Sequence, residues 1–123
     1  MKIYVCHSKE LNFQDDLYDP LRKSKLNSLH EIFLPHESRE KWDFVTKDII
    51  KNSDIVIAEV SLPGNFWLGI EIGWTNAFDR KIICIYREGS KISGSLKFVC
   101  ENFIEYTDKE DMIEKLEKAL SSI

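Results

Sequence analysis

Cysteine, histidine and proline are scarce in this chain, and their scarcity excludes several classes of protein. It has three residues of each type among 123. The cysteines, Cys6, Cys84 and Cys100, are odd in number and show no C-x-x-C spacing, so no disulfide framework is expected. The histidines show no H-E-x-x-H spacing, and without a cysteine cluster the sequence predicts no metal site. We therefore expect reduced cysteines in the core, no metal and no cofactor.

Long apolar runs and a surplus of positive charge are also missing. No stretch approaches the ~18 apolar residues of a membrane-spanning helix. The N-terminal segment 1–6 is too short, and too soon followed by polar residues, for a signal peptide. The formal net charge of −4 argues against a broad nucleic-acid or membrane surface. We expect a cytoplasmic protein with neither partner, although local basic groups and helix N-termini still allow a small anionic ligand.

The chain does contain enough apolar sequence for one core. It is 43% hydrophobic and 31% charged, which is typical of a folded domain with a solvated surface. Its length is that of an ordinary domain. We find no internal repeat, low-complexity tract or linker, so residues 1–123 are predicted to form a single domain.

Strand-like and helix-like segments alternate along the chain. The predicted strands are residues 2–6, 31–34, 54–60, 81–86 and 103–106. The predicted helices are residues 13–24 with a kink or break at Pro20, 42–51 with Phe44, Val45 and Ile49 inward, 68–78, a short 95–100, and a last helix after the capping box 107–110. This alternation predicts a three-layer α/β domain, with a five-stranded parallel sheet of flavodoxin-like order 2-1-3-4-5 and helices on both faces.

Ligands of such sheets bind at the carboxyl ends of the strands, near the switch point between strands 1 and 3. His7 and Ser8 follow the first predicted strand, where their donors suit a phosphate or a sugar hydroxyl. His36 follows the second strand. A surface or capping role is the alternative for either histidine. His30 precedes a strand, at the opposite edge of the sheet, and no role is expected for it.

Glu71 lies between Gly69 and Gly73, in the predicted helix after the central strand. Backbone N–H groups and the helix dipole favour a charged carboxylate in a first helical turn. Gly69 would let a ligand approach the backbone closely. Two glycines lower helix propensity, which suggests a functional reason for them. A solvent-facing glutamate is the alternative.

Two further segments near this edge have the composition of a binding site. Asn65, Phe66 and Trp67 precede the helix of Glu71, and the two aromatic rings could stack on a planar base. The alternative is that they fill the core or a subunit interface. Ser93 and Ser95 lie in a stretch of glycine, serine and lysine that resembles a phosphate cradle but lacks Walker A spacing, and a flexible turn is the alternative.

Taken together, these segments resemble the nucleoside 2-deoxyribosyltransferase superfamily, and in particular its 2′-deoxynucleoside 5′-phosphate N-hydrolases. The strongest part is Ser-Asp-Ile-Val-Ile-Ala-Glu-Val at 53–60, followed by a loop and by Gly-Ile-Glu-Ile-Gly at 69–73. The resemblance runs from Lys2 to about Leu96. It implies cleavage or transfer at the N-glycosidic bond of a nucleoside or nucleoside 5′-monophosphate, in a homodimer or higher homo-oligomer.

The resemblance also implies roles for individual residues. Glu71 matches the nucleophile that attacks the anomeric carbon, and Tyr4 matches an active-site tyrosine on the first strand. Ser8 matches a serine of the phosphate-binding loop, and His36 a histidine after the second strand. Ser93 or Ser95 matches a phosphate-contacting serine that the family supplies from a neighbouring subunit.

The chain departs from the family at two acidic positions. The family's acid in the helix before the central strand is replaced by Thr46, and Asp48 would serve only if the helix register differed. Asn65 stands where the transferases have an aspartate, and an amide hydrogen-bonds but is no general acid. Trp74 would line or narrow the pocket. A non-catalytic nucleotide-binding module, or a TIR-like NAD-processing domain suggested by the opening Tyr-Val-Cys-His-Ser-Lys-Glu, are the alternative functions.

Overall fold

A computed structural model describes residues 1–37, 45–63 and 66–123. Its centre is a five-stranded, all-parallel sheet of order β2-β1-β3-β4-β5, which confirms the predicted topology. The strands are β1 (Lys2–His7), β2 (Glu31–Phe33), β3 (Ile55–Glu59), β4 (Lys81–Arg87) and β5 (Asn102–Tyr106). The helices are η1 (Gln14–Tyr18), α1 (Asp19–Lys23), α2 (Lys25–Leu29), η2 (Pro35–Glu37), α3 (Thr46–Lys51), α4 (Phe66–Ala77), η4 (Gly94–Phe98) and α5 (Lys109–Ser121).

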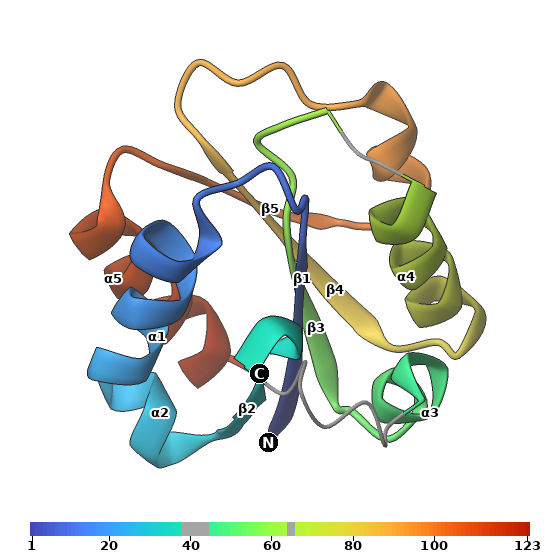
Figure 1. The fold of residues 1–123 in the computed structure, drawn as a ribbon, viewed down its shortest axis with the longest axis horizontal. Coiled ribbons are helices and arrows are strands. Elements are labelled where there is room, and N and C mark those ends of the chain that lie inside the picture. The colour runs from blue at the N-terminus through green and yellow to red at the C-terminus, as the bar shows by residue number, and fades with distance from the viewer. Residues whose placement is uncertain (38–44, 64–65) are drawn as a thin grey trace.

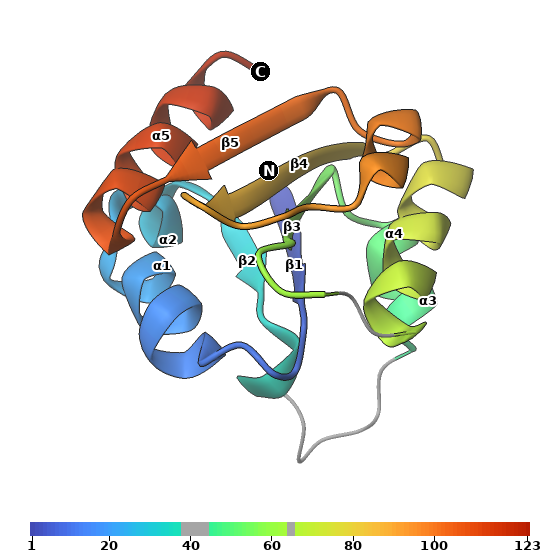
Figure 2. The same cartoon turned by 90° about the horizontal axis from the view of Figure 1, so that it is seen from above.

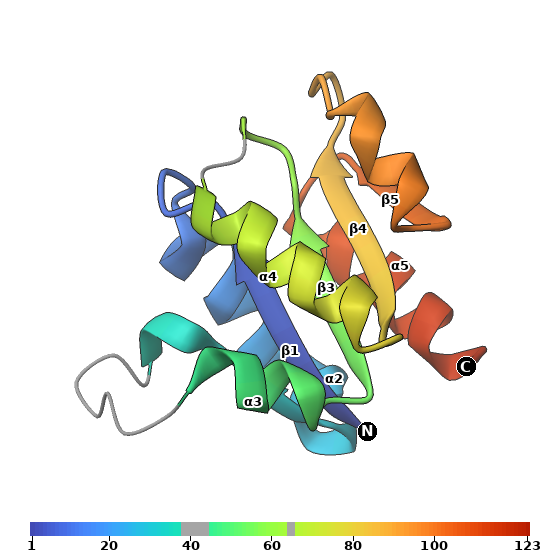
Figure 3. The same cartoon turned by 90° about the vertical axis from the view of Figure 1, so that its right-hand side faces the viewer.

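Helices cover both faces of the sheet, as predicted. Figure 1 shows α1, α2 and α5 on one side and α3 and α4 on the other, and the view from above in Figure 2 has the same layering. In Figure 3 the α3 and α4 helices lie in front of β1 and β3. Each face has its own apolar core, because successive side chains of a strand point to opposite sides. On β1, Ile3 and Val5 pack toward the first group of helices, and Tyr4 and Cys6 toward the second.

The expected kink at Pro20 takes the form of a π-helical stretch. The η1 segment is wound wider than an α-helix, and the N–H of Asp19 donates to the carbonyl of Gln14, five residues back. Pro20 lies in the first turn of α1, directly after this stretch. The wider turn removes the clash that a proline ring makes with the carbonyl four residues before it, so the helix continues without a break.

Helix α2 has no counterpart in the sequence prediction. Its signal is Ser24, which is extended and accepts a hydrogen bond from the N–H of Leu26 at 3.2 Å. Such an N-cap starts a new helix immediately after α1 ends. The predicted single helix over 13–24 therefore corresponds to two helical segments, and a third follows it.

Two other helix starts differ from the prediction. Val45 was expected inside a helix and facing inward, but it is extended and 60% exposed, while Ile50 is fully buried. The other expected inward residues of that helix are Phe44, which lies outside the described residues, and Ile49, which is half-buried. The last helix is capped by Asp108 rather than Thr107: its carboxylate accepts from the N–H of Asp111 at 2.8 Å.

Candidate active site

Glu71 and Tyr4 form a buried polar pair on the side of the sheet that α3 and α4 cover. Tyr4, in the middle of β1, is fully buried, and its hydroxyl donates a short hydrogen bond to Oε2 of Glu71. Glu71 is 3% exposed. One turn further along α4, the hydroxyl of Thr75 donates to the carbonyl oxygen of Glu71 at 2.7 Å. The carboxylate is therefore held between the sheet and its own helix.

Burial changes the ionisation of both partners. Loss of hydration raises the pKa of the Glu71 carboxyl to about 7, although the hydrogen bond from Tyr4 opposes the rise. The pKa of the Tyr4 hydroxyl is raised far above its usual range, by burial and by the neighbouring carboxylate. Glu71 thus titrates near neutrality, as acids and bases of active sites commonly do.

The prediction of a first-turn glutamate stabilised by the helix dipole was wrong. Helix α4 begins at Phe66, two residues earlier than expected, so Glu71 lies in its second turn. The dipole acts mainly within the terminal turn. Desolvation therefore dominates, and the alternative of a solvent-facing glutamate is also wrong.

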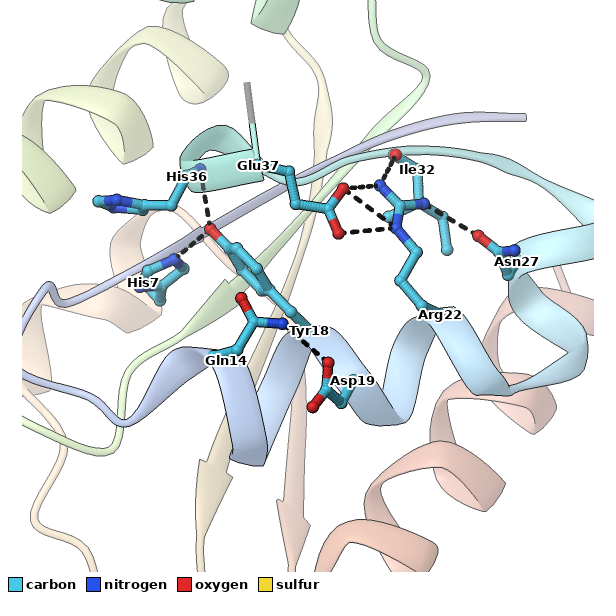
Figure 4. Close-up of polar contacts among 9 residues, drawn as sticks. All are labelled: His7, Gln14, Tyr18, Asp19, Arg22, Asn27, Ile32, His36 and Glu37. Carbon is cyan, nitrogen blue, oxygen red and sulfur yellow. Dashed lines mark hydrogen bonds and ion pairs between the residues drawn. The ribbon is translucent and has the colours of Figure 1, made fainter. Parts of the chain in front are cut away.

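His7 lies on the other face of the sheet, in a cluster of aromatic rings. Its Nδ1–H donates to the carbonyl of Ser8 at 2.8 Å, so its Nε2 accepts from the hydroxyl of Tyr18 at 2.7 Å. The Tyr18 hydroxyl also accepts from the backbone N–H of His36 at 3.2 Å (Figure 4). The rings of Phe13 and His36 stack with centroids 4.4 Å apart. Desolvation lowers the pKa of His7, so this ring is neutral at pH 7.

Arg22 holds the segment that carries His36. Its guanidinium donates to both carboxylate oxygens of Glu37, to the carbonyl of Ile32 and to the side chain of Asn27 (Figure 4). These bonds join α1, α2 and β2 to η2. Neither Tyr18 nor Arg22 was singled out from the sequence. Of the two, Tyr18 had a recognisable sequence signal, because it follows the apolar Leu17 in the predicted helix.

Ser8 is 2% exposed, and its own turn uses its hydroxyl oxygen. That oxygen accepts from the N–H of Glu10 at 3.2 Å, and the N–H of Leu11 donates to the Ser8 carbonyl. A phosphate would therefore meet mainly the exposed residues of this loop in its present conformation.

Gly69, Ser93 and Ser95 share a pocket of about 480 Å³ beside α4. The rest of its lining is mostly apolar: Val60, Leu62, Pro63, Leu68, Ile72, Lys91, Ile92 and Leu96. The two serine hydroxyls hydrogen-bond one another at 2.7 Å. Of the aromatic residues before Glu71, Phe66 is 93% and Trp67 52% exposed. The alternative that they fill the core is therefore wrong.

Asp48 lies in a different pocket, of about 320 Å³, between α3 and the first two strands. Phe33 lines this pocket too and stacks on Tyr4 with ring centroids 5.6 Å apart. Thr46 is the first residue of α3. Asn65 lies outside the described residues. Asp48 thus lines the same pocket as a phenylalanine that stacks on Tyr4, and the structure shows no hydrogen bond between Asp48 and Glu71.

A second buried carboxylate was not singled out from the sequence. Glu59, the last residue of β3, is 2% exposed and accepts hydrogen bonds from Ser61 and Tyr106. Its signal was an acidic residue in the most apolar strand. The three cysteines are buried and unpaired by disulfides, as expected.

Residues 1–37, 45–63 and 66–123 contain no group of three or more acidic, histidine or cysteine side chains placed to hold a metal ion. In the same part of the chain, no helix has the length and apolar character needed to cross a membrane.

Comparison with solved structures finds the same fold in two named enzymes. The chain superposes on a CMP N-glycosidase from Clostridium botulinum with a TM-score of 0.70 and 21% identity, over 95% of this chain and 99% of the other. It superposes on a 2-deoxyribosyltransferase from Bacillus psychrosaccharolyticus with a TM-score of 0.64 and 17% identity, over 91% and 90%. No protein-family model and no curated protein sequence matches. The fold suggested by the sequence motifs is thereby confirmed.

Proposed function

We propose that residues 1–123 form one domain that cleaves or transfers the N-glycosidic bond of a nucleoside or nucleoside 5′-monophosphate, with Glu71 as the nucleophile. The observation that carries the proposal is the buried Glu71–Tyr4 pair, with a carboxyl pKa of about 7. The shared fold with a CMP N-glycosidase and a 2-deoxyribosyltransferase supports the same reaction class.

In this mechanism an oxygen of the ionised Glu71 attacks C1′ as the bond from C1′ to the base nitrogen breaks. The base leaves with the electron pair of that bond and takes up a proton. The transition state resembles an oxocarbenium ion, and its product is a glycosyl ester of Glu71. Attack on C1′ by water, or by the nitrogen of a second base, then frees the carboxylate. Tyr4 keeps the carboxylate oriented, because its hydroxyl donates to one oxygen.

Asp48 is the residue that we propose as the acid for the departing base. Its pocket is lined by Phe33, which stacks on Tyr4, and this supports a position near the Tyr4–Glu71 pair. Removal of a positioned general acid lowers rates by about 10²–10⁴-fold. Asp48→Asn should therefore slow base release from substrates with poor leaving groups most. Binding of the sugar or phosphate is proposed for the remaining candidates, His7, Ser8, His36, Asn65, Gly69, Ser93 and Ser95.

The test is base release from a panel of deoxynucleosides, their 5′-monophosphates, ribonucleotides and NAD. We expect turnover of at least one nucleoside or nucleotide, loss of turnover in Glu71→Gln, and full turnover in the matched control Glu101→Gln on the exposed surface. Unchanged turnover in Glu71→Gln would contradict the nucleophile. Thermal stabilisation by a ligand without turnover would favour a non-catalytic binding module. Cleavage of NAD and of no other compound would favour the TIR-like alternative.

We also propose that the protein is a homodimer joined through α4. The only charged residue of this helix is Glu71, which is buried, so its outer face has no charge. That face exposes Phe66, Trp67 and Ile70, and a side chain added at Gly73 would meet open space. Exposed apolar surface of this kind marks an interaction site. A second copy fits it, because a two-fold axis brings the same uncharged face to both sides.

A further inference from the structure

The buried carboxylate of Glu59 has no part in the proposed reaction. It lies on the sheet face opposite Glu71, at the carboxyl end of β3, among the side chains that pack toward α5. Three groups donate to it: the N–H of Ser61 at 2.6 Å, the hydroxyl of Ser61 at 2.9 Å, and the hydroxyl of Tyr106. A carboxylate removed from water is strongly unfavourable without such donors. These three donors therefore suit a carboxylate, which offers two acceptor oxygens.

Ser61 connects this carboxylate to the rest of the sheet. Its hydroxyl donates to Glu59 and accepts from the N–H of Arg87, the last residue of β4, at 2.7 Å. The N–H of Val60 donates to the carbonyl of Ile85 at 2.9 Å. The start of the connection from β3 to α4 is thus fixed to β3 and β4 directly, and to β5 through Tyr106.

The residues after Ser61 form a wall against the helix of Glu71. Leu62 and Pro63 line the pocket of about 480 Å³ together with Leu68, Gly69 and Ile72 of α4. Val60, directly before Ser61, packs in the same apolar cluster as Leu68 and Ile72, one turn before and one residue after Glu71. A shift of Ser61 would therefore move one side of the pocket and loosen the packing of Val60 against the helix that presents the carboxylate.

We propose that Glu59 is a positioning residue for the reaction at Glu71. Its carboxylate holds Ser61, and through Ser61 it fixes the wall of Leu62 and Pro63 against α4. Glu59 itself touches neither the substrate nor Glu71. The expected effect on base release rests on the proposed function. The expected loosening of α4 rests on the hydrogen bonds of Glu59 and Ser61 alone.

Three variants separate positioning from simple stabilisation. Glu59→Gln keeps the size of the side chain and replaces one acceptor oxygen by a donor. Ser61→Ala removes the link between Glu59 and Arg87. Tyr106→Phe is the matched control, because it removes a donor to the same carboxylate and leaves both hydrogen bonds from Ser61 to Glu59, and the bond from Arg87 to Ser61, in place.

We expect Glu59→Gln and Ser61→Ala to lower kcat for base release about 10–10²-fold, as small misplacements of reacting groups do. Their double variant should be no slower than the worse single one, since both break one link. Tyr106→Phe should lower Tm while kcat stays within about twofold. Equal kcat in all three variants, or losses of kcat that follow Tm, would overturn the proposal.

Amide hydrogen exchange of the same proteins, without substrate, tests the structural step independently of any activity. Glu59→Gln and Ser61→Ala should speed exchange at Leu62 and at Leu68–Ile72, and Tyr106→Phe should not. If the wild-type protein releases no base, the proposed function fails and this measurement still decides the role of Glu59. Unchanged exchange in α4 would overturn that role.

Discussion

Glu71 illustrates how the surroundings of one carboxyl group decide its chemistry. Loss of hydration holds its pKa near 7, and the Tyr4 hydroxyl keeps the pKa from rising further. Both the protonated and the ionised forms are then populated near neutral pH. A retaining nucleophile needs that ionised form, so the rate of the proposed reaction should rise with pH through about 7 and level off above it.

Tyr4→Phe should move this pH dependence upward. The variant removes the donor that stabilises the ionised carboxylate, so the pKa of Glu71 rises. A hydrogen bond to a charged group contributes about 1.5–3 kcal/mol, which corresponds to a shift of roughly one to two pH units. The measurement is kcat for base release from pH 5 to 10. A midpoint equal to that of the wild-type protein would contradict the coupling.

Glu71→Gln should stabilise the protein at high pH. The native carboxyl keeps its proton up to about pH 7, whereas the unfolded one releases it near 4.5. Native stability is therefore unaffected below the unfolded pKa and is lost as pH rises through the folded one. The variant cannot ionise, so its advantage in free energy of unfolding should grow by up to about 3 kcal/mol between these values. Urea unfolding at pH 5 and pH 8 checks this, and an advantage independent of pH would contradict it.

At this scale the sequence singled out Glu71 as a candidate in the helix after β3, but did not predict its burial. Position followed from a glutamate between glycines after an apolar strand. Burial depends on which face of α4 packs against β1, where the side chain meets Tyr4, and that is a tertiary property. The partner that His7 and His36 share was not predictable in the same way, because the Tyr18 hydroxyl reaches both through tertiary packing.

Among the secondary-structure elements, the predictions from sequence differ most from the structure at the ends of helices. Alternation of apolar residues located every strand and the longer helices. It missed α2, because a capping serine directly after another helix looks like that helix's own end. It also could not show that a π-helical stretch precedes Pro20, since apolar spacing does not reveal which carbonyl each N–H pairs with.

The N-cap of α5 gives a direct test at this scale. Asp108→Ala should lower the free energy of unfolding by about 1 kcal/mol, because the N–H of Asp111 loses its acceptor at the start of the helix. Asp108→Asn is the control, since an asparagine caps nearly as well. Urea midpoints at an unchanged m-value measure both. Equal losses in the two variants would show that the charge matters rather than the cap.

At the scale of the whole molecule, the proposed dimer follows from the outer face of α4 (Phe66–Ala77), which carries no charge. Ile70→Lys should convert a dimer to a monomer in size-exclusion chromatography with light scattering, because two lysines would meet across the axis. Leu29→Lys is the control, an apolar residue 67% exposed at the end of α2. A wild-type monomer at all concentrations, or a dimer that survives Ile70→Lys, would contradict the interface. The sequence suggested an oligomer only through its family resemblance, since which helix face stays uncovered is a property of the assembled fold.

The place of β1 inside the sheet, between β2 and β3, has a consequence for synthesis on the ribosome. This strand is made first, yet its longest pairing is with β3, from Ile3–Ile55 to His7–Glu59. About 50 residues of chain separate the partners, which takes several seconds at ~5–20 residues per second. Only the three-residue β2 is available to it in the meantime. The nascent chain must therefore carry an apolar strand with one unpaired edge for that time, and slowing or speeding translation between β2 and β3 should change the yield of folded protein.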